Sequence, residues 1–184
     1  MTRRRLQLTA ALVLVLGLAV ASIALASGGN KGHGKGGKHF RANLIGFHEV
    51  PAINTTGHAR VKLTMTDTEI AFVLTYAGLS GPPAAAHIHV GQFNVNGGVS
   101  VFFCGGGGQP ACPAATSGTV SGTITAANVV GPTAQGYNVG DLAPVEKAIR
   151  AGVTYANMHT AKFPAGEIRG QIVRGKHGHE DHKK

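Results

Sequence analysis

Apolar and polar residues alternate with a period of two along much of this 184-residue chain. In the stretch 61–66, Val61, Leu63 and Met65 would face one side of a strand, because successive side chains of a strand point in opposite directions. Asp67-Thr68 is typical of a turn, and the alternation resumes over 70–76 as the partner strand. We expect six further strands, at 40–48, 86–91, 98–103, 118–125, 153–159 and 166–173.

One short helix is expected between residues 141 and 152. Asp141 would cap it, Pro144 suits its first turn and Gly152 would end it. Three apolar residues would share its buried face: Leu142, Val145 and Ile149. About eight strands and one helix, without strand–helix alternation, predict a single all-β domain, an antiparallel β-sandwich or Greek-key barrel. The 28 glycines and 14% charged residues likewise disfavour a helical bundle.

Residues 1–26 have the pattern of a secretory signal peptide. Arg3, Arg4 and Arg5 precede an apolar run that ends in Ala24-Leu25-Ala26, with small residues at the expected cleavage site. A retained membrane anchor is the alternative, because the run approaches the roughly 18 residues needed to span a bilayer. The arginine cluster leaves both general and twin-arginine export open. No second apolar span follows, so we expect a secreted protein without a transmembrane segment after cleavage.

The net charge of +9 lies mostly outside the expected domain. Residues 27–39 are rich in Gly, Lys and His and are expected to form a flexible linker, and 175–184 a disordered His/Lys tail, which leaves 40–174 as the β domain. Between residues 42 and 173, six basic residues meet six acidic ones. This balance predicts no specific nucleic-acid partner. The two flexible segments could bind metal ions or anionic polymers weakly, although such tracts are usually only solvated.

Cys104 and Cys112 flank a glycine-rich loop. An oxidising compartment outside the cytoplasm favours a disulfide between them, and the flexible loop lets the chain double back. The spacing is not that of a CxxC redox or metal motif. The sequence therefore predicts a structural disulfide.

Histidines in the expected domain provide the candidate chemistry. His87 and His89 lie two residues apart, so a strand would present both on one face and offer two nitrogen ligands to a metal ion. Tyr155, Asn157 and His159 would share a face of a second strand, followed by Thr160. In the last strand Glu167 and Arg169 would share a face, where pairing with neighbours would set the strand register.

Two of these segments resemble the CHRD family, the domain named after chordin, which is found in bacterial secreted proteins. The segment Ala86-His-Ile-His-Val-Gly91 and its continuation Asn-Gly-Gly-Val-Ser-Val-Phe-Phe are one part of the resemblance. The other part is Tyr155-Ala-Asn-Met-His-Thr160 with Gly166-Glu-Ile-Arg-Gly170. The resemblance covers about residues 40–173, including the early segment 44–51 that contains Glu49. It implies an extracellular all-β domain and no defined reaction, and the cysteine loop is a local insertion relative to the family.

The histidines have two interpretations. In the first, His87, His89 and His159 join Asn157 and Glu167 in a hydrogen-bonded polar cluster that pins two strands together. In the second, the three imidazoles bind copper or zinc, the metals that suit such ligands, with His48 or His58 as more distant candidates. Superoxide-dismutase-like activity is a remote third, because further ligands are missing. We expect a non-enzymatic secreted module without catalytic residues, which binds an extracellular protein or cell-surface partner or has a structural role.

Overall fold

The computed structural model describes residues 38–175, and the predicted signal peptide, most of the linker and the tail from residue 176 lie outside this range. The nine strands are β1 (Lys38–Ile45), β2 (His58–Met65), β3 (Ile70–Ala77), β4 (Pro83–Val90), β5 (Gly98–Cys104), β6 (Gly118–Ile124), β7 (Thr154–Thr160), β8 (Ile168–Gln171) and β9 (Val173–Arg174). The helical elements are α1 (Leu142–Ala151) and the 3-10 turns η1 (Gly46–His48), η2 (Ala126–Asn128) and η3 (Thr133–Gln135).

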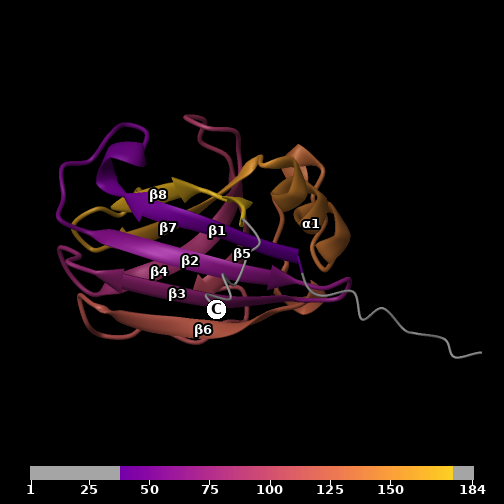
Figure 1. Ribbon diagram of the computed structural model, residues 1–184, viewed down its shortest axis with the longest axis horizontal. Helices are drawn as coiled ribbons and strands as arrows, with labels where there is room; N and C mark the ends of the chain where they lie inside the picture. The colour runs from indigo at the N-terminus through magenta and orange to yellow at the C-terminus, as the bar shows by residue number, and fades with distance from the viewer. Residues whose placement is uncertain (1–37, 176–184) are drawn as a thin grey trace, which may run out of the picture. The chain divides into compact units, whose positions relative to one another are not determined.

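All the strands belong to one antiparallel sheet with the order β5-β4-β7-β8-β1-β2-β3-β6, and β9 pairs with β1. The strands at the two ends of this order, β5 and β6, contact each other. The sheet is therefore curled into a nearly closed barrel, with β1, β2, β3 and β6 on the near side of Figure 1 and β8, β7 and β4 behind them. This confirms the all-β prediction and selects a barrel-like arrangement.

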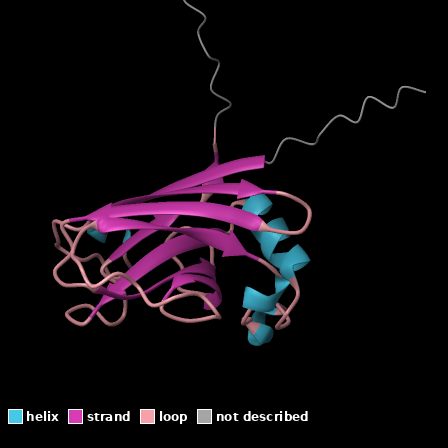
Figure 2. Ribbon diagram, turned by 90° about the horizontal axis from the view of Figure 1, so that it is seen from below, coloured by secondary structure: helices cyan, strands magenta, loops and turns pink. Residues whose placement is uncertain are grey.

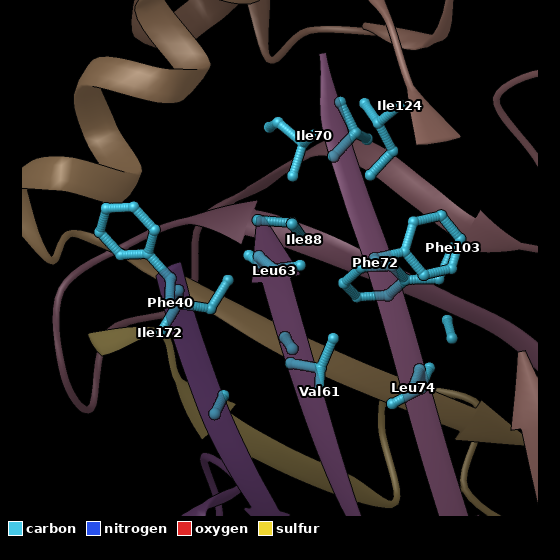
Figure 3. Close-up of a cluster of buried hydrophobic side chains, with 14 of the residues drawn as sticks. Phe40, Val61, Leu63, Ile70, Phe72, Leu74, Ile88, Phe103, Ile124 and Ile172 are labelled. Carbon is cyan, nitrogen blue, oxygen red and sulfur yellow. The ribbon is translucent and has the colours of Figure 1, made fainter. Parts of the chain in front are cut away.

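The barrel interior is filled by the apolar residues of the period-two pattern. Phe40, Leu63, Phe72 and Phe103 are buried there, and Figure 3 shows them in one cluster with Ile88. The rings of Phe72 and Phe103 contact each other at a tilt of 59°, with their centroids 4.9 Å apart. Burying a side chain of this size stabilises the fold by about 1.5–3 kcal/mol. This gain explains why apolar residues occupy every second position of the strands.

Helix α1 lies at one end of the strands (Figure 2). It buries Leu142, Val145 and Ile149, as predicted, and Gly152 ends it in the left-handed conformation at φ 72°. Asp141 occupies the N-cap position, but its side chain makes no capping hydrogen bond, so that part of the prediction is wrong. Among the described residues no helix has the length and apolar character required to cross a membrane.

Several strand boundaries differ from the predicted ones. β1 begins at Lys38, inside the segment assigned to the linker, and ends at Ile45, because the chain turns at Gly46, whose carbonyl accepts hydrogen bonds from two later amides. The last predicted strand is split into β8 and β9 on either side of Ile172, whose amide donates a hydrogen bond to the Thr154 carbonyl.

Cys104 and Cys112 form the predicted disulfide, which ties the loop after β5 to the end of that strand.

Candidate functional site

The outer face of β4, β7 and β8 is polar and yet buried. We call it the covered face, and it comprises His87, His89, Tyr155, Asn157, His159 and Arg169. Only 6% of His87, 3% of Asn157 and 2% of Arg169 is exposed. The loop 91–97 contacts this face, and Asn96 of that loop donates a hydrogen bond to the Val50 carbonyl of the loop 46–57. These residues therefore form a second, polar layer outside the apolar barrel.

Strand pairing brings three histidines together on this face. His87 lies directly opposite Asn157, and His159 lies opposite Ala85, one diagonal step from His87. The ring centroids of His87 and His89 are 4.6 Å apart, and those of His87 and His159 are 4.5 Å apart. One nitrogen from each of the three rings lies within 4.8 Å of the other two. His87 and His89, predicted to share a face of one strand, thus form one cluster with His159 of a second strand.

Backbone carbonyls orient two of the rings. Nδ1 of His89 lies 2.8 Å from the Gly97 carbonyl oxygen, and Nδ1 of His159 lies 2.9 Å from that of Pro164. A carbonyl can only accept, so each Nδ1 carries the proton and each Nε2 of the neutral ring carries a lone pair. Nε2 of His89, Nε2 of His159 and Nδ1 of His87 are buried and have no hydrogen-bond partner. Metal-binding histidines are typically oriented by such carbonyl contacts.

The surroundings keep these rings neutral. Burial lowers the pKa of His87 to about 2, and the neighbouring His89 and His159 act in the same direction. Burial also lowers the pKa of His89 to about 4, although the Gly97 carbonyl and Asn157 side chain favour its protonated form. The pKa of His159 is lowered by burial, against the effect of the Pro164 carbonyl. At neutral pH all three rings are therefore uncharged and able to donate lone pairs.

Aromatic rings form the walls of the cluster. The His89 ring stacks on Tyr155 with a centroid distance of 4.5 Å and an angle of 6° between the planes. Phe102 of β5 contacts His87 edge-on at 5.0 Å. The guanidinium of Arg169 also lies over the Tyr155 ring, 3.4 Å from its centroid. The rings limit the positions that His87 and His89 can adopt.

Arg169 holds the loop 91–97 over the site through hydrogen bonds. Its guanidinium donates hydrogen bonds to the Val95 carbonyl at 2.8 Å and to Oδ1 of Asn96 at 3.0 Å. The same loop contains Gly97, whose amide donates to the Tyr155 hydroxyl and whose carbonyl orients His89. Arg169 therefore acts on the histidine cluster through the backbone of this loop.

The carboxyl group of Glu49 interacts electrostatically with Arg169 in the covered layer, and no role was predicted for it. Its Oε1 accepts a hydrogen bond from Asn157, whose amide also donates to the Ile168 carbonyl. Burial raises the pKa of Glu49 to about 7, although Arg169 and the Asn157 hydrogen bond oppose the rise. The sequence did not single out Glu49, because its partners lie more than a hundred residues away along the chain.

Glu167 has a different environment from the histidines. Its carboxylate accepts hydrogen bonds from the hydroxyls of Thr55, Ser80 and Thr160 and from the Ser80 amide. Burial raises its pKa, but these four hydrogen bonds outweigh burial and hold the pKa below its usual value. Glu167 therefore joins the 46–57 loop, the β3–β4 connection and β7 as an ionised anchor.

The two glycines of the Gly-Glu-Ile-Arg-Gly motif allow these elements to approach one another. Gly166 has φ 131°, and a Cβ there would lie 2.8 Å from both Nδ2 of Asn157 and Oε1 of Glu49. A Cβ on Gly170 would overlap the Asn43 carbonyl oxygen of β1. A residue larger than glycine would therefore clash at position 166 or 170, on either side of the segment that contains Glu167 and Arg169.

His48 and His58, the more distant candidate ligands, do not join the cluster in the described part of the chain. His48 packs beside Phe93, with ring centroids 6.4 Å apart. His58 is exposed on β2, and its Nδ1 lies 3.1 Å from the Thr56 carbonyl. The cluster therefore consists of the three residues His87, His89 and His159.

Comparison with known families agrees with this architecture. The family model of the CHRD domain matches residues 40–172, which contain most of β1 and all of β2 to β8. The chain therefore belongs to the CHRD domain family. Searches of curated proteins and of solved structures found no match.

Proposed function

We propose that this CHRD domain is an exported, non-enzymatic binding module whose His87, His89 and His159 bind one copper or zinc ion. The observation that carries the proposal is the set of three buried ring nitrogens without hydrogen-bond partners. A buried polar atom without a partner costs about 1–3 kcal/mol, and a bound cation would remove that cost at three atoms together.

The geometry is close to what such an ion requires. Metal–nitrogen distances of about 2.0–2.1 Å put the nitrogens of a tetrahedral site roughly 3.3 Å apart. The observed nitrogens lie within 4.8 Å of one another, so small ring rotations would bring them to an ion. Neutral imidazoles suit zinc and copper in preference to calcium or magnesium, which bind oxygen.

Export is supported by two features. Residues 1–26 have the composition of a signal peptide, and Cys104–Cys112 is a disulfide of the kind that persists outside the cytoplasm. The non-enzymatic part rests on the donor set, because the described cluster contains three histidines without the carboxylate ligand of a superoxide-dismutase-type centre. A copper-loaded sample should accordingly show no dismutation of superoxide above that of free copper, and higher activity would contradict this part.

Calorimetric titration of the exported, metal-free protein with Cu(II) and with Zn(II) tests the binding. We expect one ion per chain, and a loss of affinity of more than about 100-fold in His87→Gln and in His159→Gln, since even outer-shell changes cost 10–100-fold. His58→Gln is the matched control and should bind like the wild type. Replacing His33, His177, His179 and His182 by Gln removes background binding by histidines that precede residue 38 or follow residue 175.

Electron paramagnetic resonance of the Cu(II) protein gives an independent readout. Coupling to three nitrogens is expected in the wild type, and to fewer in His87→Gln. Thermal unfolding of each variant establishes that it is folded before its affinity is compared. Unchanged stoichiometric binding in both ligand variants, or no binding by the wild type, would refute the metal site.

A further inference from the structure

A second outer face of the barrel concentrates positive charge. Most outward residues of β1, β2, β3 and β6 are exposed, and we call this surface the cationic face. Its charged residues are Arg41, Arg60 and Lys62, with His39 and His58 beside them, and no acidic residue occupies an outward position of these four strands. The neighbouring polar residues are neutral, namely Asn43, Thr64, Thr75, Thr119, Ser121 and Thr123.

Two of these cations stand side by side. Arg41 on β1 is directly opposite Lys62 on β2, and Arg60 is opposite Asn43, to which its Nε donates a hydrogen bond of 3.2 Å. Directly opposed residues have Cβ atoms about 4.5–5.5 Å apart, and like charges at this separation destabilise a sheet. A bound anion would remove this repulsion, and the arrangement therefore favours an anionic ligand.

The equal numbers of acidic and basic residues between positions 42 and 173 do not reveal the positive charge of this face. Three of the six acidic residues between 42 and 173 are buried, namely Glu49, Glu146 and Glu167. Asp67 and Glu69 lie in the turn between β2 and β3, at one end of the face, and Asp141 precedes α1. Among the basic residues of the same range only Arg169 is buried. The folded surface is therefore more positive than the sum of its residues.

The edge of the same face is where the described chain enters and leaves. β9 pairs with β1, and the Gly175 amide donates to the His39 carbonyl at 2.9 Å. The sequence continues with Lys31 and Lys35 before β1 and with Lys176, Lys183 and Lys184 after β9. Both flanking segments carry more basic than acidic residues, and in the sequence they adjoin β1, which contains Arg41, and its neighbour β9.

We propose that the cationic face binds an anionic polymer outside the cytoplasm, one that presents repeated phosphate, sulfate or carboxylate groups. Outward residues of the same strand lie about 6.7 Å apart, so Arg60 and Lys62 can contact successive anionic groups. A nucleic acid is disfavoured, because bases bind through aromatic stacking and no outward position of these four strands holds Phe, Tyr or Trp. The proposal is independent of the metal site.

Binding to three labelled probes tests the proposal, with heparin for sulfate, polyphosphate for phosphate and polygalacturonate for carboxylate, and labelled single-stranded DNA is the nucleic-acid comparison. The exported full chain is titrated in EDTA at several salt concentrations, so that metal binding plays no part. The test variant combines R41Q with K62Q. The matched control combines K147Q with K162Q, which removes the same charge from α1 and from the β7–β8 loop. A third variant replaces the lysines at 31, 35, 176, 183 and 184 by Gln.

At low salt we expect R41Q/K62Q to bind at least one of these probes about tenfold more weakly, and its salt dependence to be shallower by about two units of slope. K147Q/K162Q should change affinity less than threefold. The probe that binds most tightly identifies the anionic group. Equal losses in both double variants, binding lost only with the terminal lysines, or binding to single-stranded DNA alone would each overturn the proposal. Thermal unfolding establishes that all variants are folded.

Discussion

The covered face and the cationic face are two outer surfaces of one sheet, and they differ in exposure to solvent. Both arise from strands that alternate apolar and polar residues, and both turn their apolar rows into the same core. The loops 46–57 and 91–97 lie over the first, where Arg169 is 2% exposed. The second is left to solvent, and Arg60 there is exposed. The difference shows that the loops decide the environment of a polar residue on a strand.

Burial changes what the same residue types can do. On the covered face, histidine rings are neutral and oriented by carbonyl groups, so they are prepared to bind a metal ion. On the cationic face, charged side chains remain hydrated and interact through long-range attraction that salt weakens. Each of the following predictions concerns one of these two faces.

Removing the buried arginine of the covered face should have the largest effect, and removing an exposed arginine of the cationic face is its control. Arg169→Met is expected to lower the free energy of unfolding by about 3–5 kcal/mol, because it leaves Glu49 and three acceptors of the loop 91–97 without their buried cation. Arg60→Met on the exposed face should change it by less than about 0.5 kcal/mol. Urea unfolding followed by circular dichroism measures both, and equal effects would contradict the distinction.

A metal ion should stabilise the protein through the covered face alone. At a free Zn(II) concentration 100 times the dissociation constant, stability rises by about 2.7 kcal/mol. We expect this increase as a higher melting temperature in the wild type and in His58→Gln. It should fall below about 0.4 kcal/mol in His87→Gln at the same concentration, because this variant binds more than 100-fold more weakly, and differential scanning fluorimetry checks it. An equal shift in all three proteins would place the binding elsewhere.

Acid should destabilise the metal-free protein. His87 and His89 have folded pKa values of about 2 and about 4, below the ordinary value of 6.5, so between pH 6.5 and 4 the unfolded chain binds more protons. Their contribution to stability is present above pH 6.5 and decreases as the pH falls. Glu49, with a folded pKa of about 7, binds protons preferentially in the folded state and opposes this decrease.

The net result is a loss on the order of 2 kcal/mol between pH 7 and pH 5, because two depressed histidines outweigh one raised carboxyl. Glu49→Gln removes the opposing group and should make the loss steeper. Unfolding curves at both pH values measure the difference. Equal pH dependence of wild type and variant would show that Glu49 does not titrate as described.

Relieving the repulsion on the cationic face should have the smallest effect. Lys62→Thr removes one of two directly opposed cations and places a good strand former on β2. We expect a gain of about 0.2–0.5 kcal/mol at low salt that disappears in 1 M salt. Thermal unfolding at both salt concentrations tests this, and a gain that persists at high salt would assign it to strand propensity.

Much of the molecule could be read from local patterns. Alternation located the strands, because an inward residue at every second position follows directly from strand geometry. The amphipathic stretch before Gly152 located α1, and the short cysteine spacing located the disulfide. These features depend on residues close in sequence, and a chain carries such information without knowledge of its fold. The errors were in details such as the missing side-chain cap at Asp141 and the end of β1 at Ile45, because single hydrogen bonds of the folded chain decide these details and periodicity does not report them.

The tertiary structure alone determined which strands are neighbours and which side of the sheet is covered. β4 pairs with β7 across more than sixty residues, and this pairing places His159 beside His87. The burial of Glu49 and Glu167 leaves an excess of positive charge on the opposite surface. Periodicity describes one strand at a time, whereas strand order and loop placement depend on how all the apolar rows close into a common core, which is a property of the whole chain.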